Sequence, residues 1–341
     1  MKYLVTGGCG FVGCNLAALL LSKGHAVTVF DSFARAGAES NLAWLKDRGA
    51  LESIKGDTRN TNEIEAAIRA GSFSAIFHLA GQVAMTTSMQ NPRQDFEINV
   101  GGTLNILESV RQFSPQTSVV YASSNKVYGE LTWLELSERD TRYTPKSGAT
   151  GVDESAPLDF QTPYGCSKGA ADQYMLDYAR CFGLNTVVFR HSSIYGGRQF
   201  STYDQGWVGW FCRQALEIQR DPLRKPFTIS GDGKQVRDLL HATDAARCYL
   251  AAAENIVRTR GQAFNIGGGH ANSLSLLELF AHLEEKLGVK MRFDKLPWRP
   301  RDQKYFVADA AKAQRLFGWT PQVTKEAGID EALAWEKSRL S

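Results

Sequence analysis

The sequence predicts an α/β fold with a doubly wound parallel sheet, and three observations support this prediction. Short apolar runs that suit strands alternate with segments of helical apolar spacing through the first half of the chain. Glycines at three-residue spacing separate the first strand from the first helix. The chain has 341 residues, 43% of them hydrophobic and 22% charged, which is enough for one large domain or two moderate ones.

The expected strands and helices alternate along the chain. Strands are expected at 2–6, 26–31, 51–55, 75–79, 118–123 and 185–190, and helices at 11–23, 61–70, 91–113 and 164–182. Repeated strand–helix units form parallel sheets that helices cover on both faces, and ligands bind at the carboxyl ends of the strands. Residues 130–162 break the pattern with a charged, Thr- and Gly-rich stretch, which we interpret as an excursion over the active site.

The later part of the chain is expected to form a smaller, discontinuous C-terminal substrate-binding domain. Its apolar periodicity is less regular, and aromatic residues cluster at 207–211. We expect a Rossmann-type domain over 1–190 and about 236–258, and the substrate-binding domain over about 191–235 and 259–341.

Charge and composition argue against several classes of protein. Lys and Arg number 39 and Asp and Glu 36, and a net charge of +3 is too small for a nucleic-acid surface. No apolar run reaches the roughly 20 residues of a membrane span, and the N-terminus lacks the basic region and cleavage site of a signal peptide. The six cysteines form no C-x-x-C pair, and no ligand spacing supports zinc. We therefore expect a cytoplasmic protein without a metal, a membrane or a nucleic-acid partner.

The glycine cluster after the first strand predicts a dinucleotide site. Gly7 would permit a tight turn, Gly10 would let the backbone approach a pyrophosphate, and Gly13 would let the helix and strand pack closely. Asp31 ends the second strand, where its carboxylate would accept hydrogen bonds from ribose hydroxyls and repel a 2′-phosphate. NAD is therefore favoured over NADP, although the nearby Arg35 leaves tolerance of that phosphate open.

A tyrosine and a lysine four residues apart predict the catalytic centre. Tyr164 and Lys168 would share one face of a helix, where the lysine charge and the positive nicotinamide ring of NAD⁺ favour the phenolate. Such a pair occurs by chance on many helices. Ser124, at the end of the fifth strand, and the dinucleotide site upstream make the catalytic interpretation the favoured one.

Together these motifs resemble the extended short-chain dehydrogenase/reductase family of nucleotide-sugar epimerases and dehydratases, over the full chain. The resemblance rests on the glycine motif, Asp57, His78-Leu79-Ala80-Gly81, Asn99 with Gly102-Thr103, Ser124 before Val127-Tyr128-Gly129, and Tyr164 with Lys168. It implies that Ser124 hydrogen-bonds the reacting hydroxyl, Tyr164 removes its proton, and Lys168 holds both the ribose and the phenolate.

The resemblance also implies which residues contact the ligands. The NAD contacts would be Gly7, Gly10, Phe11, Val12, Gly13, Asp31, Asp57, Thr58, Leu79, Ala80, Gln82, Asn99, Tyr164 and Lys168. The substrate contacts would be Thr86, Ser124, Asn125, Tyr164, His191, Ser192, Gln205, Trp207, Val208, Arg237 and Arg299.

Several of these assignments have structural alternatives. Asp57 would accept from the adenine amine or belong to a turn. His191 would be a proton carrier or a structural histidine, and His78 is expected to be structural. Arg237 and Arg299 would bind the diphosphate, or pair with neighbouring carboxylates on the surface. Aromatic side chains at 207, 210 and 211 would line the pocket or, as the favoured interpretation, pack in a helix core.

The residues after Ser124 separate members of the family by activity. Sugar dehydratases of this family typically carry an Asp-Glu pair there, because elimination of water needs a general acid and a general base. Asn125 and Lys126 supply no such pair, so dehydration is disfavoured and an epimerase or a dehydrogenase remains. In relatives the position two residues after the one that corresponds to Arg299 is often glycine, whereas this sequence has Arg301 there.

Four longer stretches resemble members of the family that invert C2 of CDP-hexoses. These stretches are 81–88, 124–129, 189–193 and 203–211. They imply a CDP-sugar substrate, an isomerase that oxidises C2 transiently, and a homodimer joined through the helices at 91–113 and 164–182. A 4-epimerase or dehydrogenase of another nucleotide sugar, and a non-catalytic dinucleotide sensor, remain as alternatives.

Overall fold

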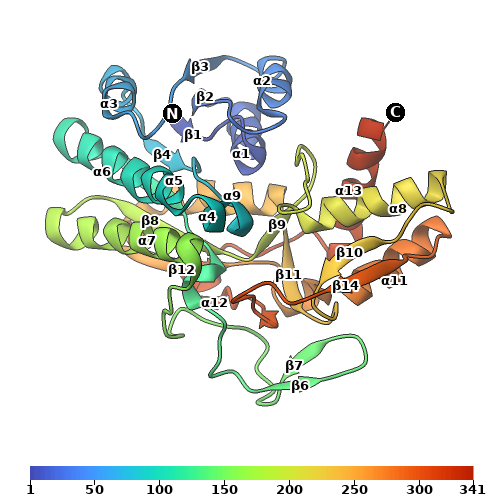
Figure 1. Cartoon of the computed structure of the whole chain (residues 1–341). Coiled ribbons are helices and arrows are strands. Elements are labelled where there is room, and N and C mark those ends of the chain that lie inside the picture. The colour runs from blue at the N-terminus through green and yellow to red at the C-terminus, as the bar shows by residue number, and fades with distance from the viewer. Residues whose placement is uncertain (341) are drawn as a thin grey trace.

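The structure is a computed structural model that describes residues 1–340. Its larger part is a seven-stranded sheet in the order β12-β8-β5-β4-β1-β2-β3, and every neighbouring pair is parallel. Helices cover the sheet on both faces (Figure 1). The predicted doubly wound α/β fold is confirmed.

The elements of this larger part follow the predicted alternation closely. The strands are β1 (Lys2–Thr6), β2 (Ala26–Asp31), β3 (Leu51–Lys55), β4 (Ala75–His78), β5 (Ser118–Ala122), β8 (Thr186–His191) and β12 (Gln262–Ile266). The helices are α1 (Phe11–Ser22), α2 (Ala38–Lys46), α3 (Thr61–Ala70), α4 (Met85–Gln90), α5 (Pro92–Phe96), α6 (Gly102–Phe113), α7 (Thr162–Phe182), α9 (Ala242–Glu254) and α10 (Ile256–Thr259).

The single helix expected at 91–113 is instead interrupted. The segment η1 (Glu97–Gly101) between α5 and α6 is a π-helix, a form that is frequent at functional sites. It contains Asn99, one of the predicted NAD contacts.

Side chains of the central strand alternate between two hydrophobic cores. Tyr3 and Val5 pack in one core with residues of α1 and α9, whereas Leu4 packs in the other with residues of α3, α6 and α7. Because successive side chains of a strand point to opposite faces, the continuous apolar run of β1 serves both cores. This two-sided burial positions the carboxyl ends of the strands at one rigid edge.

The smaller part contains a second sheet and its own core. Its strands are β9 (Ser193–Tyr195), β10 (Phe227–Ser230), β11 (Val236–His241), β13 (Ser273–Ser275), β14 (Phe293–Leu296) and β15 (Tyr305–Phe306). Its helices are α8 (Trp207–Arg220), α11 (Leu276–Leu287), α12 (Ala311–Phe317) and α13 (Lys325–Leu340), together with the short 3-10 segment η3 (His270–Asn272). Aromatic and aliphatic side chains of α8, α11 and α13 form the core of this part.

Two strands pair with strands of the other expected domain. β12 lies within 259–341 but pairs with β8 in the large sheet, and β11 lies within 236–258 but pairs with β9, β13 and β15. A short apolar run carries no signal of which sheet it joins, because pairing partners are distant in sequence. The division into two domains stays a prediction.

The excursion at 130–162 packs against the smaller part. It contains the antiparallel hairpin of β6 (Leu136–Glu138) and β7 (Tyr143–Pro145) (Figure 1). Arg142 of the hairpin pairs with Glu278 at 2.7 Å, and the Tyr143 hydroxyl donates to Asp232 at 2.5 Å. None of its residues lines the cavity described below, so its expected place over the active site stays a prediction.

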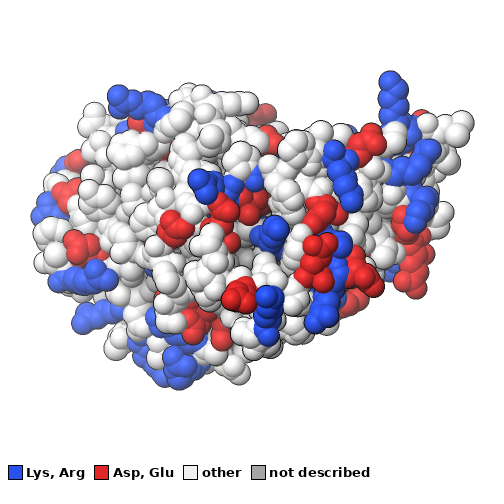
Figure 2. Space-filling view, turned by 60° about the horizontal axis from the view of Figure 1, so that its bottom comes forward, with Lys and Arg blue, Asp and Glu red and all other residues white. Residues whose placement is uncertain are grey.

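The charged side chains are dispersed, as the small net charge predicts. On the face shown in Figure 2, basic and acidic side chains are interspersed, with no broad area of one sign. In the part of the chain that the structure describes, no helix has the length and apolar character needed to cross a membrane.

Candidate active site

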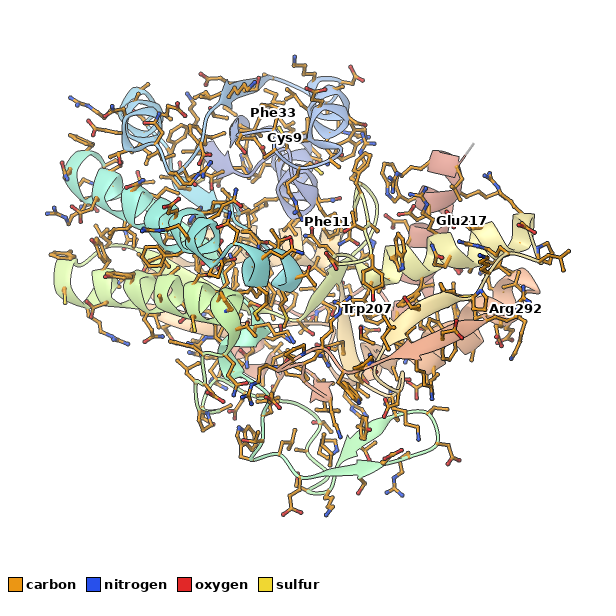
Figure 3. The ribbon with its side chains drawn as sticks, in the orientation of Figure 1. Cys9, Phe11, Phe33, Trp207, Glu217 and Arg292 are labelled. Atoms are coloured by element: carbon orange, nitrogen blue, oxygen red, sulfur yellow. The ribbon has the colours of Figure 1, made fainter. Side chains whose placement is uncertain are left out.

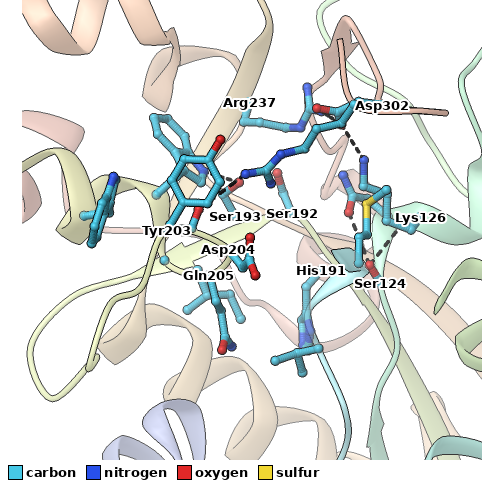
Figure 4. A pocket seen from close by; sticks show the side chains of 18 of the residues that line it. Ser124, Lys126, His191, Ser192, Ser193, Tyr203, Asp204, Gln205, Arg237 and Asp302 are labelled. Atoms are coloured by element: carbon cyan, nitrogen blue, oxygen red, sulfur yellow. Dashed lines mark hydrogen bonds and ion pairs between the residues drawn. The ribbon is translucent and has the colours of Figure 1, made fainter. Parts of the chain in front are cut away.

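A cavity of about 370 Å³ lies where the carboxyl ends of the central strands meet the smaller part of the molecule. Phe11, the first residue of α1, and Trp207, the first residue of α8, both line it (Figure 3). Most of its other lining residues follow β5, or belong to β8, β9, β10, β11, α7, α8 and the segments 203–206 and 299–302 (Figure 4). The predicted catalytic tyrosine and serine and both predicted arginines are among them.

The glycine loop has the backbone geometry that the motif predicts. Gly7 has a φ of +67°, and a Cβ there would lie 2.7 Å from the backbone nitrogen of Ala80. A Cβ on Gly13 would lie 2.8 Å from the Cα of Gly8, so α1 packs on the loop at a distance that only glycine permits. A Cβ on Gly10 would meet only the Gly7 oxygen, and no side chain caps the first amides of α1. These free amides suit an anion.

Asp31 completes a site that fits the adenosine half of NAD. Its buried carboxylate accepts from the backbone nitrogens of Cys9 at 2.9 Å and Phe33 at 2.8 Å. Each oxygen accepts one of these bonds and retains a lone pair for a ribose hydroxyl. A glycine cradle that a Cβ would fill, next to a fixed carboxylate, is therefore a suitable NAD site.

Asp57 already has a local partner. Its carboxylate accepts hydrogen bonds from the Arg59 guanidinium, the shortest at 2.6 Å, and these bonds lower the pKa of the carboxyl group. The adjacent Thr58 is buried against Gly102, where a Cβ would lie 2.6 Å from its hydroxyl oxygen. The adenine contact of Asp57 stays a prediction, and the alternative of a turn has a structural basis.

The segment after β4 is tied to the π-helix. The backbone nitrogen of Gln82 donates to the Asn99 side chain at 2.9 Å, and the Asn99 amide donates to the Gln82 carbonyl at 3.2 Å. Asn99 also donates to the Ser167 hydroxyl of α7 at 3.0 Å. Asn99 therefore links the strand end that carries Leu79 and Ala80 to the helix that carries the catalytic pair.

The structure brings the predicted catalytic residues together. Ser124 caps the N-terminus of the 3-10 helix η2 (Asn125–Tyr128), and its hydroxyl lies close enough to the Tyr164 phenol to influence the pKa of that group. Burial raises the pKa of Tyr164 to about 12, while the hydrogen bond with Ser124 and the charge of Arg35 oppose this rise. The phenol therefore needs additional positive charge nearby to act as a base at neutral pH.

Lys168 lies one turn further along α7 and is buried. Its Nζ donates to the carbonyl oxygen of Ala122 at 2.9 Å. Burial lowers the pKa of Lys168 to about 8, and the nearby carboxylate of Asp95 opposes this shift. A Cβ on Gly81 would lie 3.0 Å from Nζ, so glycine there leaves space for the ammonium group.

Two cations bond one carboxylate at the other side of the cavity, and a third lies on a neighbouring tyrosine. Arg237 Nη2 donates to Asp302 at 2.9 Å, and Lys126 Nζ donates to the same oxygen at 2.7 Å. Arg299 donates to the backbone carbonyl of Tyr203 at 3.3 Å and lies over its ring. Arg237 thus pairs with Asp302 rather than with its sequence neighbour Asp238.

Sequence reasoning missed Lys126, Asp302 and Gln303 as residues of this site. Gln303 is fully buried and donates to the carbonyl oxygens of Asn125 at 3.1 Å and Gly129 at 2.7 Å. The Asn125 amide in turn donates to Gln303 at 2.9 Å. The motif that contains Arg299 was the only available signal for these contacts.

Arg301 adopts the backbone conformation that glycine favours. Its φ is +58°, in the left-handed region, and its guanidinium pairs with Glu130 at 2.8 Å. Glycine adopts this conformation without strain, which is consistent with the resemblance noted for this position.

The predicted substrate contacts divide into two groups. His191, Ser192, Gln205 and Trp207 line the cavity, whereas Thr86 and Val208 do not. Val208 is buried in the core of the smaller part, because one face of α8 must pack inward.

The contacts of the histidines and of the aromatic side chains of α8 bear on two open alternatives. His191 bonds the Tyr249 hydroxyl at 2.7 Å, and burial lowers its pKa to about 3, which favours a structural role. Because His191 also lines the cavity, its contact with the substrate stays a prediction. His78 is likewise buried between the hydroxyls of Thr6 and Thr103. The aromatic side chains at 207, 210 and 211 contact both the core and the cavity, so neither alternative alone was complete.

No arrangement of three or more His, Cys, Asp or Glu side chains suitable for a metal ion occurs within residues 1–340.

Comparison with known proteins identifies the class. Residues 3–267 match the model of the NAD dependent epimerase/dehydratase family, and this chain belongs to that family. This match confirms the resemblance that the motifs predicted, and with it the dependence on NAD.

One curated relative has a particular activity within this family. The CDP-paratose 2-epimerase of Salmonella typhi is 57% identical over 338 residues, which cover 99% of this chain and 100% of the relative.

Solved structures of other family members share the fold over their whole length. The UDP-glucose 4-epimerase of Thermus thermophilus, in complex with NAD, is 28% identical, with a TM-score of 0.82 and 99% of each chain covered. The UDP-glucuronic acid 4-epimerase of Bacillus cereus, in complex with UDP-glucuronic acid and NAD, is 26% identical, with a TM-score of 0.85. It covers 99% of this chain and 100% of its own.

Proposed function

We propose that this chain is an NAD-dependent isomerase that inverts C2 of a CDP-hexose, in the manner of CDP-paratose to CDP-tyvelose. The observation that carries the proposal is the 57% identity to a CDP-paratose 2-epimerase over 99% of the chain. The cavity supports it, because the serine, tyrosine and lysine that an alcohol oxidation needs are all in place.

The chain's own residues would control the proton at the C2 hydroxyl. NAD, held by the glycine loop and Asp31, would supply the reversible oxidation of C2 when bound. Ser124 would hydrogen-bond the hydroxyl, and Tyr164 would take its proton and later return it to the same oxygen. Lys168 would hold positive charge close to the phenolate and lower the cost of forming it.

The segment after Ser124 favours epimerisation over dehydration. The Asn125 amide donates to Gln303, and Lys126 is a cation. Neither residue is a carboxylate, so this segment has no general base that could remove a proton from the sugar ring. An oxidation followed by reduction on the opposite face requires the sugar to turn while the nucleotide stays bound. The cationic cluster of Arg237 and Arg299 would provide that grip on the diphosphate.

We also propose a cytoplasmic homodimer that joins through α5, α6 and α7. Phe96, Phe113, Tyr174 and Phe182 leave 53%, 37%, 43% and 52% of their surface exposed. α6 and α7 run side by side on one flank of the sheet (Figure 1). Apolar side chains gathered on neighbouring helices are typical of a surface that another copy covers.

The experiment that tests the function is an incubation of the NAD-loaded protein with CDP-paratose in heavy water. We expect the C2 epimer to form without solvent deuterium at C2, as measured by NMR of the product. Deuterium at C2 would instead indicate removal of a carbon-bound proton beside a carbonyl. Inversion at C4, or net accumulation of NADH, would identify a 4-epimerase or a dehydrogenase.

A further inference from the structure

Lys126 is a buried cation beside the catalytic serine that no motif assigns to a ligand. Its side chain is 14% exposed and lines the cavity, and its backbone nitrogen donates to the Ser124 hydroxyl at 3.2 Å. Nζ bonds Asp302 at 2.7 Å (Figure 4). The ammonium group is therefore fixed near the position where the sugar reacts.

The charges around Lys126 do not balance. Burial lowers the pKa of Lys126, and the charges of Arg237 and Arg299 lower it further while Asp302 opposes the shift. The three cations together lower the pKa of Asp302 against the effect of its burial. One carboxylate thus offsets three cations. Asp204 also lines the cavity, but within residues 1–340 no ion pair joins it to the cluster. The cluster around Asp302 therefore has an excess of positive charge, which remains positive when Asp204 is counted and favours an anionic ligand such as a diphosphate.

The position of Lys126 distinguishes it from the two arginines. Ser124 would hold the C2 hydroxyl, and in a nucleotide sugar the neighbouring carbon C1 bears the terminal phosphate of the diphosphate. Lys126 follows Ser124 by two residues, whereas Arg237 and Arg299 come from β11 and the segment 299–302 of the smaller part. Lys126 is thus the cavity-lining cation closest in sequence to the serine, and Asp302 holds its ammonium group at the wall of the cavity that the arginines share.

We propose that Lys126 binds the phosphate bonded to C1 of the hexose, and that Asp302 acts as a positioning residue that holds the ammonium group in place. The proposal rests on the proposed function, since it takes a nucleoside diphosphate sugar as the ligand. It makes Lys126 a contact of the second phosphate only, in addition to the arginines that bind the diphosphate.

The test compares CDP with CMP, which lacks that second phosphate, by calorimetry on the NAD-loaded protein. In Lys126→Met we expect the Kd of CDP to rise roughly 10- to 100-fold, because a hydrogen bond to a charged group is lost. The Kd of CMP should change less than about threefold. Asp302 keeps Arg237 as a partner in this variant, so the fold is expected to survive, and retained NAD content verifies this.

The matched control is Lys304→Met. Lys304 lies over the rings of Tyr143 and Trp298 and is not among the residues that line the cavity, so neither Kd should change. An unchanged Kd for CDP in Lys126→Met, or an equal loss for CDP and CMP, would overturn the proposal. If wild-type protein prefers UDP to CDP, the proposed nucleotide is wrong, and the same comparison made with UDP and UMP still decides the role of Lys126.

Discussion

Replacing Gly10 or Gly13 by alanine separates two roles of the glycine loop, which are NAD binding and the packing of α1. Gly10 has φ −73° and ψ 175°, a conformation that alanine adopts freely, and a Cβ there would meet nothing closer than the Gly7 oxygen at 3.1 Å. The methyl group of Gly10→Ala would instead project to the open side of the loop. We therefore expect unfolding free energy to change by less than about 1 kcal/mol while NAD affinity falls about tenfold or more.

Gly13→Ala should act on the fold first. Its Cβ would lie 2.8 Å from the Cα of Gly8, about 1 Å short of an ordinary carbon–carbon contact, and the obstructing atoms belong to the backbone. Overpacking of this kind costs about 1–3 kcal/mol, and the loop or α1 must move to relieve it. We expect a lower melting temperature together with weaker NAD binding.

The assay measures both properties in the same preparations. Urea denaturation of NAD-free protein gives the unfolding free energy, and titration with NAD gives the Kd. Gly101→Ala is a matched control, because a Cβ at that helical position meets nothing within 4 Å. Wild-type NAD affinity in Gly10→Ala would refute the reasoning, since it would show that the pyrophosphate does not approach this face of the loop.

Three further predictions concern catalysis and stability. Tyr164→Phe should lower turnover by about 10²-fold or more with NAD content retained, and an equal loss of NAD would make Tyr164 structural. Asp172→Asn should lower the unfolding free energy from urea denaturation by about 3–5 kcal/mol, because fully buried Asp172 pairs with Arg190 at 2.9 Å and the substitution leaves that charge unpaired. A loss of unfolding free energy below about 1 kcal/mol would contradict this. Burial lowers the pKa of both His78 and His191 to about 3, so their stabilising effect is complete above about pH 6.5 and is lost as the pH falls toward 3. His78→Gln should therefore reduce the pH slope of the unfolding free energy between about pH 6 and 4 by up to about 1.4 kcal/mol per pH unit, and an unchanged slope would argue against a neutral His78.

Local sequence was sufficient for six of the seven strands of the large sheet and for the cofactor loop. The strand β1 is a short apolar run between polar positions, and the glycines that follow it determine their own backbone geometry, as the φ of +67° at Gly7 shows. Tyr164 and Lys168 are four residues apart on one helix, so their common face follows from helical periodicity alone. These features depend on contacts between residues close in the chain.

Only the tertiary structure decided how distant segments meet at the cavity. Lys126 and Asp302 are separated by 176 residues, and nothing in either segment indicates their 2.7 Å contact. The same holds for β12, which joins the large sheet, and for Val208, whose side chain turns into the core. Local propensity describes a residue and its near neighbours, whereas strand pairing and side-chain burial depend on contacts across the whole chain. The sequence by itself therefore determined the helices, strands and motifs of this protein, and the tertiary structure decided which of them meet.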